Sequence, residues 1–200
     1  MDGKVLMALW ILAAYLVGGV PFGFLIGKMR GVDVRTLGSR NIGATNVYRT
    51  VGPAWGFLAF FCDVMKGLLP TLAACLGGPD GLDPVYVGLA CVTGHTLTPY
   101  MKFRGGKGVA TAFGMLLALI PGLVGVAFAL FVVAVWLSHY ISLGSCLAAA
   151  VLAVAIWIPT PLARPSRSVQ VVMTLVGVFV IAKHRGNLVR LAKGCENKIY

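Results

Sequence analysis

The residues able to do chemistry in this 200-residue chain are concentrated in three short segments between long apolar runs. The first segment, residues 38–49, reads Gly-Ser-Arg-Asn-Ile-Gly-Ala-Thr-Asn-Val-Tyr-Arg. Small residues let backbone N–H groups approach a ligand, hydroxyls and amides donate hydrogen bonds, and the fork of an arginine fits a phosphate. We therefore predict an anion-binding segment. The alternative is a solvated juxtamembrane loop whose cations pair with anionic lipid head groups.

The second segment, residues 94–111, contains Gly105-Gly106-Lys107-Gly108 directly before an apolar run. A helix start offers unsatisfied N–H groups and the positive end of the dipole, and the lysine adds a charge, so we predict that it binds a phosphate. The segment is not a Walker A loop, because that motif requires glycine at Met101 and Ser or Thr at Gly108. The alternatives are a tight turn for the glycines and a structural, helix-end role for His95.

The third segment, residues 183–191, reads Lys-His-Arg-Gly-Asn-Leu-Val-Arg-Leu and follows the last apolar run. If the helix continues through it, His184 and Asn187 lie on one face, one turn apart. Taken alone, such a basic helix end is typical of an interfacial anchor. In the company of the other two segments, it predicts a shared pocket that holds more than one phosphate group.

The chain offers no pattern typical of an activated nucleophile or of a metal site. It has no G-x-S-x-G elbow and no His, Cys and carboxylate cluster at metal-ligand spacing, so we predict neither a metal nor a cofactor. Such a site suits a reaction whose electrophile arrives activated, because the protein then supplies positioning and charge stabilisation. The rival functions are a small transporter of anions or phosphate esters and a non-catalytic scaffold that binds acidic lipids.

The apolar runs that must position these segments indicate an integral membrane protein. The chain is 58% hydrophobic and only 12% charged, with a mean hydropathy of +0.89, whereas soluble domains are about 25% charged. We predict an all-α, polytopic fold in a single transmembrane catalytic domain, residues 1–200, with seven transmembrane helices, or five as the fallback. The expected helices cover residues 5–27, 55–76, 85–95, 108–120, 123–137, 141–158 and 169–182.

The basic residues predict the orientation of these helices. The net charge is +11, and 13 of the 17 Lys and Arg residues lie in segments 28–49, 102–107 and 183–198, which seven crossings place on one side. The positive-inside rule makes that side cytoplasmic, with the N-terminus outside and the C-terminus cytoplasmic. Topology thus explains the charge, and no nucleic-acid partner is expected.

Asp63 and Lys66 are ionisable residues inside the second apolar run, three positions apart and hence on one helical face. Charges within a span are costly and are commonly functional. Two interpretations remain open: an ion pair that holds helices together, or a supporting role beside the site.

Together the three segments resemble the PlsY family, the bacterial membrane glycerol-3-phosphate acyltransferases that use acyl phosphate. The matching blocks are Gly-Ser-x-Asn-x-Gly-Ala-Thr-Asn-x-x-Arg, Gly-His…Pro…Phe-x-Gly-Gly-Lys-Gly-Val-Ala-Thr and His-Arg-x-Asn…Arg-Leu, and the resemblance covers the whole chain. It implies a multi-pass enzyme of the bacterial cytoplasmic (inner) membrane, with its active site on the cytoplasmic face. The implied reaction acylates the 1-hydroxyl of glycerol 3-phosphate to give lysophosphatidic acid and inorganic phosphate, the first step of phospholipid synthesis. No obligatory protein partner is expected.

The resemblance also implies roles for individual residues. Catalytic roles fall to His184, Ser39 and Asn187, with either His184 or a substrate phosphate oxygen as the general base. Asp63 and Lys66 are expected in support, and Arg40 stands where many members of the family have glycine. No role is carried over to Glu196, which is expected to pair with the basic tail. The residues implied in substrate and phosphate binding are Asn41, Thr45, Asn46, Arg49, Gly105, Gly106, Lys107 and Gly108.

Overall fold

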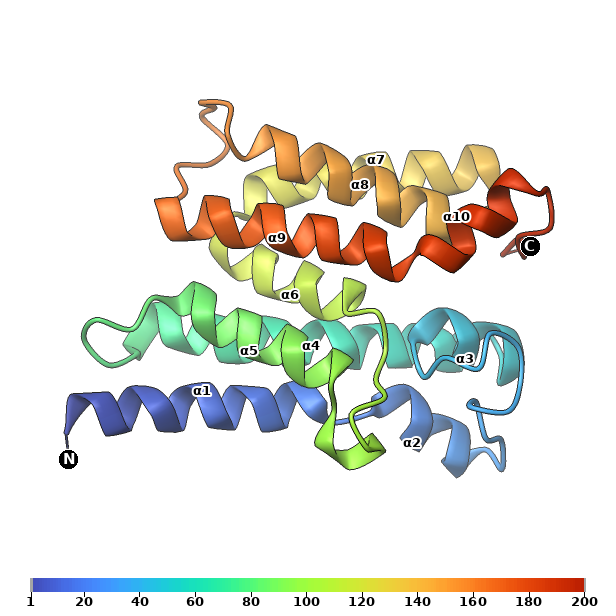
Figure 1. The fold of residues 1–200 in the computed structure, drawn as a ribbon, viewed down its shortest axis with the longest axis horizontal. Helices are drawn as coiled ribbons and strands as arrows, with labels where there is room; N and C mark the ends of the chain where they lie inside the picture. Colours follow the sequence, from blue (N-terminus) through green and yellow to red (C-terminus); the bar gives the residue numbers. More distant parts are fainter. Residues whose placement is uncertain (1, 200) are drawn as a thin grey trace. The chain divides into compact units, whose positions relative to one another are not determined.

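The computed structural model describes residues 2–199, which form helices and turns but no strand (Figure 1). The contacts divide the chain into two units, residues 1–119 and 120–200, which are described separately. The first unit contains α1 (Gly3–Gly19), α2 (Phe22–Met29), α3 (Ala44–Thr50), α4 (Pro53–Gly77), α5 (Pro84–Thr96), the 3-10 turn η1 (Pro99–Met101) and α6 (Val109–Leu119). The second contains α7 (Pro121–Ser138), α8 (Ile141–Ala155), α9 (Arg167–Lys183) and α10 (Arg185–Ala192).

Helix α4 is the centre of the first unit, since it packs against α3, α5 and α6, while α1 packs against α5. Glycines let α4 and α6 approach at backbone distance. A Cβ atom at Gly67 would fall on the Thr111 carbonyl, and one at Gly114 would fall on the Val64 carbonyl. Small residues at such contacts are typical of helix packing in membranes.

The first apolar run is not one continuous helix. It was expected to be unbroken over residues 5–27, but the chain leaves helical geometry at Val20 and Pro21, between α1 and α2. Proline lacks the N–H that an α-helix needs, and two polar side chains bind the carbonyls freed at the break. Lys66 Nζ donates to the Val20 carbonyl at 2.8 Å, and Thr98 Oγ1 donates to the Gly19 carbonyl at 2.7 Å.

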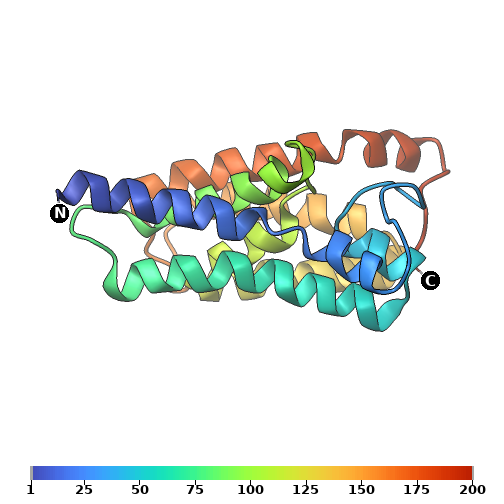
Figure 2. The ribbon, with the colours of Figure 1, turned by 90° about the horizontal axis from the view of Figure 1, so that it is seen from below.

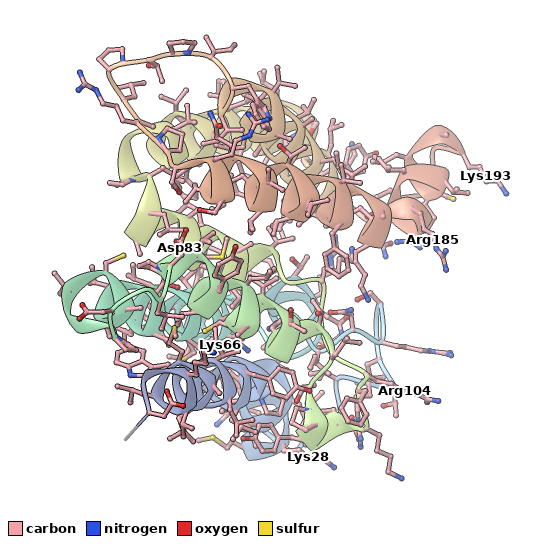
Figure 3. The ribbon with its side chains drawn as sticks, turned by 60° about the vertical axis from the view of Figure 1, so that its left-hand side comes forward. Lys28, Lys66, Asp83, Arg104, Arg185 and Lys193 are labelled. Atoms are coloured by element: carbon pink, nitrogen blue, oxygen red, sulfur yellow. The ribbon has the colours of Figure 1, made fainter. Side chains whose placement is uncertain are left out.

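The loops of the first unit gather at its two ends. Figures 1 and 2 show α2 and α3 at one end, opposite the start of α1 and the turn between α4 and α5, while the loop before α6 runs beside the break between α1 and α2. Figure 3 shows Lys28 and Arg104 extending from the loop-rich end, whereas Lys66 lies among the helices. The segments at this end carry Lys28, Arg30, Arg35, Arg40, Arg49, Lys102, Arg104 and Lys107.

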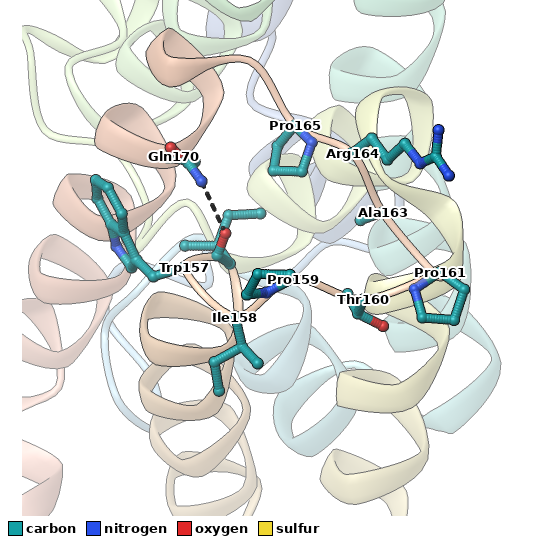
Figure 4. A pocket seen from close by; sticks show the side chains of 10 residues that line it. Trp157, Ile158, Pro159, Thr160, Pro161, Ala163, Arg164, Pro165 and Gln170 are labelled. Carbon is teal, nitrogen blue, oxygen red and sulfur yellow. Dashed lines mark hydrogen bonds between the residues drawn. The ribbon is translucent and has the colours of Figure 1, made fainter.

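In the second unit, α8 packs against both α7 and α9. Helices α9 and α10 meet at His184 with a bend of 53°, at the end of this unit opposite the α8–α9 loop (Figure 1). That loop and Gln170 of α9 line a hollow, in which Gln170 Nε2 donates to the Ile156 carbonyl at 3.2 Å (Figure 4). None of the predicted site residues lines this hollow.

Three stretches of the described chain are long and apolar enough to cross a membrane: Gly3–Met29, Pro53–Gly77 and Pro121–Ser138. The bent pair α9 and α10 would be a fourth if it forms one span. Helix α6 has 11 residues and rises only about 16 Å, against roughly 30 Å of hydrocarbon. The all-α membrane fold is therefore confirmed, while the seven crossings and their orientation stay predictions.

Candidate functional site

Asn46 organises the first segment from within. Its side chain is buried, with 1% exposed, and its amide binds the loop backbone on both sides. Oδ1 accepts from the Ser39 N–H at 2.8 Å, while Nδ2 donates to the carbonyls of Val34 at 2.7 Å and Leu37 at 3.2 Å. A side chain so engaged positions Ser39 and closes the loop. The sequence had led us to expect that Asn46 binds a substrate phosphate. With its amide engaged by the loop backbone, it is poorly placed to do so directly.

The backbone of this segment turns through left-handed geometry at Gly38 (φ 56°) and Arg40 (φ 58°). Glycine adopts such angles without strain, whereas a residue with a side chain, such as Arg40, adopts them at a cost in free energy. Asn41 Oδ1 accepts from the Gly43 N–H at 2.8 Å, just before α3 begins. Ser39 is exposed at the turn, whereas Thr45 and Arg49 are half-buried on α3.

Asp33 neutralises part of the positive charge beside this segment. Arg35 binds it through two side-chain hydrogen bonds, Nε to Oδ1 at 2.9 Å and Nη2 to Oδ2 at 2.6 Å, and Lys28 Nζ lies 3.7 Å from Oδ2. The hydrogen bonds from Arg35 hold the pKa of Asp33 well below its usual range. The carboxylate is therefore ionised at neutral pH. The Asp-x-Arg spacing of Asp33 and Arg35 was a signal in the sequence from which this pair could have been predicted.

The glycine segment folds back onto the end of α5. The Gly105 N–H donates to the Thr96 carbonyl and the Gly106 N–H to the His95 carbonyl, both at 3.1 Å. The expectation that these two amides are open to an anion is therefore wrong, because backbone carbonyls already use them. Gly108 is left-handed (φ 83°) and leads directly into α6, whose first-turn amides lack partners within the helix.

A buried charged group lies beneath this fold-back. Lys66 Nζ is 2.6 Å from Asp63 Oδ1, and His95 Nδ1 is 3.6 Å from the same oxygen. All three side chains are at most 6% exposed. The prediction that Asp63 and Lys66 share a helical face is confirmed, and their further contact with the glycine segment, through His95, was missed.

His184 occupies the bend between α9 and α10, so the condition under which His184 and Asn187 would share one continuous helix face is not met. It is 3% exposed, and its Nδ1 lies 2.8 Å from the Val180 carbonyl. A carbonyl can only accept, so Nδ1 carries the proton and the lone pair of the neutral ring is on Nε2.

Glu196 holds Asn187 in place through a hydrogen bond that the sequence did not predict. It is 8% exposed and accepts hydrogen bonds from Ser142 Oγ at 3.0 Å, Asn187 Nδ2 at 2.5 Å and Arg190 Nε at 2.7 Å. Burial alone raises the pKa of Glu196, but these hydrogen bonds outweigh it and hold the pKa below its usual range. The expected pairing with the basic tail is confirmed by Arg190, while the contact that orients Asn187 was not foreseen.

The two units divide the predicted residues between them. His184 and Asn187 belong to the second unit, and all the others belong to the first. Within the first unit, Met101 packs against a cluster that includes Ile42 and Val47, so the second segment contacts the first. Residues 2–199 contain no group of three or more His, Cys, Asp or Glu side chains arranged to hold a metal ion.

Comparisons with known proteins point in one direction. A family model described as glycerol-3-phosphate acyltransferase matches residues 8–194. The glycerol-3-phosphate acyltransferases of Trichlorobacter lovleyi and Geobacter sulfurreducens are each 47% identical, over 94% and 92% of this chain and 95% and 93% of their own lengths.

Two crystal structures of PlsY, an integral membrane glycerol 3-phosphate acyltransferase, are also similar. The glycerol 3-phosphate form gives a TM-score of 0.88 at 36% identity, and the lysophosphatidic acid form gives 0.85 at 35%. Each match covers 96% of this chain and 94% of the other.

Proposed function

This chain belongs to the glycerol-3-phosphate acyltransferase family, and we propose that it transfers a fatty acyl group from acyl phosphate to the 1-hydroxyl of glycerol 3-phosphate. The products are lysophosphatidic acid and inorganic phosphate, in the first step of phospholipid synthesis. One observation carries the proposal: a relative with the same fold has a glycerol 3-phosphate form and a lysophosphatidic acid form. These two ligands are the acceptor and the acylated product of the reaction.

Acyl phosphate as donor is supported by the chemistry of the candidate residues. A mixed anhydride needs no further activation, and phosphate is a good leaving group, so no acyl-enzyme is required. The reaction then needs cations and amides that hold phosphate groups and stabilise charge. We assign this role to Arg49, Lys107 and the first-turn amides of α6, with Asn41 and Thr45 in support.

The glycerol hydroxyl must lose a proton as it attacks the acyl carbonyl. The acceptor is either a phosphate oxygen of a substrate or His184, with Ser39 and Asn187 orienting the glycerol. The bond from His184 Nδ1 to the Val180 carbonyl leaves the lone pair on Nε2, the form that a general base needs. Turnover against pH for wild type and His184→Asn separates the two. A variant that keeps most of its kcat and loses only affinity excludes the histidine as the base.

The donor is tested with purified protein in detergent. Glycerol 3-phosphate is supplied with acyl phosphate, acyl-CoA or acyl carrier protein, and lysophosphatidic acid and released phosphate are both measured. We expect equal amounts of the two products from acyl phosphate alone. Product from the thioesters only would overturn the donor, and no product from any donor would overturn the function.

Lys107 and Lys102 form a matched pair for the phosphate assignment, since both lie in the second segment and Lys102 is exposed. Losing one charge-assisted contact costs about 1.5–3 kcal/mol, or roughly 10- to 150-fold in kcat/KM. We expect that loss for Lys107→Met and less than a threefold change for Lys102→Met. Equal effects would mean that the general positive charge matters and not the position of Lys107.

We also propose that the loop-rich end of the first unit faces the cytoplasm from the bacterial inner membrane, because the basic residues gather there. Cys195 in the C-terminal segment and Asp80 in the turn after α4 are both exposed and are predicted on opposite sides. In a Cys75→Ser/Asp80→Cys variant, a membrane-impermeant maleimide should label position 80 in spheroplasts, and Cys195 only after permeabilisation. The reverse pattern would invert the proposed orientation.

A further inference from the structure

A buried lysine joins the break in the first apolar run to the middle of α4. Lys66 Nζ contacts Asp63 Oδ1 at 2.6 Å and the Val20 carbonyl at 2.8 Å, and it lies 5.6 Å from the centre of the Phe22 ring. A charge within a membrane span is costly unless it is paired. These partners fix the ammonium group, and through it the carboxylate of Asp63.

Asp63 in turn faces the imidazole of His95 on α5. The separation of 3.6 Å between Oδ1 and Nδ1 is longer than a hydrogen bond, but both groups are buried, so their attraction is weakly screened. The carboxylate favours the ring orientation that turns Nδ1–H toward it, which directs Nε2 away from α4.

The other side of the imidazole is the surface on which the glycine segment rests. The Gly106 N–H donates to the His95 carbonyl at 3.1 Å, and a Cβ atom at Gly106 would fall on His95 Nε2. Gly106 is therefore in contact with His95 through both backbone and ring. Lys107, the cation assigned to phosphate, is the next residue in the chain.

From this arrangement we propose that His95 is a positioning residue for the glycine segment, and that the Lys66–Asp63 pair sets the orientation of its ring. The inference rests on the proposed function, since it says how Lys107 and the amides at the start of α6 are held in place. This role differs from general packing, because the Lys66–Asp63 pair is proposed to affect substrate affinity through the contact between His95 and Gly106.

A double-mutant cycle on His95 and Gly106 tests the contact. In the wild-type background, the methyl group of Gly106→Ala falls on the ring, and we expect KM for a phosphate-bearing substrate to rise at least tenfold, with kcat within threefold. In the His95→Ala background the ring is absent, so the same substitution should raise KM less than threefold. If the two effects simply multiply, the inference is wrong.

Gly108→Ala is the matched control for the cycle. Its Cβ atom would meet Thr96 Cγ2 at 3.1 Å and Val92 Cγ1 at 3.2 Å, with no His95 atom among its nearest neighbours. Its penalty should therefore be the same with and without the His95 ring. If the rise in KM caused by Gly108→Ala also disappears in the His95→Ala background, then His95→Ala has loosened the whole loop. The coupling between His95 and Gly106 would then not be specific to their contact.

The buried pair is tested with the charge-neutral variant Asp63→Asn/Lys66→Gln, which leaves no isolated charge and keeps a donor for the Val20 carbonyl. We expect a raised KM, an unchanged circular dichroism spectrum, and weaker coupling between His95 and Gly106. Full coupling in this variant would remove the pair from the proposal. Direct titration with glycerol 3-phosphate and acyl phosphate runs beside each assay. Wild type that binds both substrates without turnover refutes the proposed function, while the coupling is still measured from the affinities.

Discussion

Replacing Asn46 reveals whether the first segment binds phosphate through this side chain or is merely held in shape by it. Asn46→Ala removes three hydrogen bonds to backbone groups, each contributing about 0.5–1.5 kcal/mol. The N–H of Ser39 regains a partner from water, because Ser39 is exposed. The expected loss of unfolding free energy is therefore about 2–4 kcal/mol.

Asn46→Asp should destabilise the protein further, although the two side chains have nearly the same shape. Its oxygens retain an acceptor for Ser39, but one of them must face the carbonyls of Val34 and Leu37, which lie 2.7 and 3.2 Å from the present donor. A buried charge without a partner costs several kcal/mol. The predicted order of stability is therefore wild type, then alanine, then aspartate.

Thermal unfolding followed with a thiol-reactive dye suits this comparison, because Cys91 is buried in the same unit. Asn41→Asp is the control, since Asn41 uses only its oxygen, toward the Gly43 N–H, and aspartate preserves that contact. If Asn46→Asp unfolds at the wild-type temperature and only raises KM, Asn46 acts on the substrate and the structural argument fails.

Three further outcomes follow from the contacts. In Glu196→Gln, part of the loss of stability on acidification should disappear, because the hydrogen bonds that lower the folded-state pKa of the glutamate stabilise the fold fully above the unfolded pKa of about 4.3, and this stabilisation is lost as pH falls through the lower folded-state pKa. Denaturant titrations below about pH 4.3 that show the same loss in the variant as in wild type would contradict the assignment. Arg40→Gly relieves a left-handed backbone (φ 58°) and should raise the unfolding free energy by up to about 1 kcal/mol in denaturant titration, whereas a decrease would give the side chain a stabilising role. Gly67→Ala places a methyl group on the Thr111 carbonyl between α4 and α6 and should lower the unfolding free energy by about 1–3 kcal/mol. An unchanged unfolding free energy would show that the two helices can move apart without cost.

The helices were predictable because their length and apolar character are local properties. The run expected at residues 55–76 is the helix Pro53–Gly77, and the run expected at 123–137 is Pro121–Ser138. The pairing of Asp63 with Lys66 was equally accessible, since a three-residue spacing alone places both on one face. The family resemblance was carried by motif spacing, which needs no coordinates.

The features that sequence reasoning missed depend on partners beyond the spacing of a single helix, across turns whose course the sequence did not predict. The fold-back of Gly105 and Gly106 depends on carbonyls at the end of α5, and the link from Asn187 to Glu196 spans nine residues across a turn. Asn46 and Thr45 are equally polar in the sequence, yet Asn46 is buried and binds backbone whereas Thr45 is half-exposed. Composition predicts that such residues bind something, but not whether the partner is a ligand or the protein.

A common physical demand connects the breaks in the apolar segments with the buried polar groups. In hydrocarbon, a carbonyl freed by a helix break costs several kcal/mol unless a donor reaches it, and here the donors are side chains. Lys66 donates a hydrogen bond to the Val20 carbonyl and Thr98 donates one to the Gly19 carbonyl. The Tyr15 hydroxyl donates to the Leu97 carbonyl at 2.7 Å. Lys66 also fixes Asp63, and Asp63 orients His95 under the glycine segment. The lysine that satisfies the free carbonyl between α1 and α2 therefore also sets, through Asp63, the orientation of that histidine. The irregular backbone and the buried charges of this unit are therefore parts of one arrangement, and changing either should disturb the other.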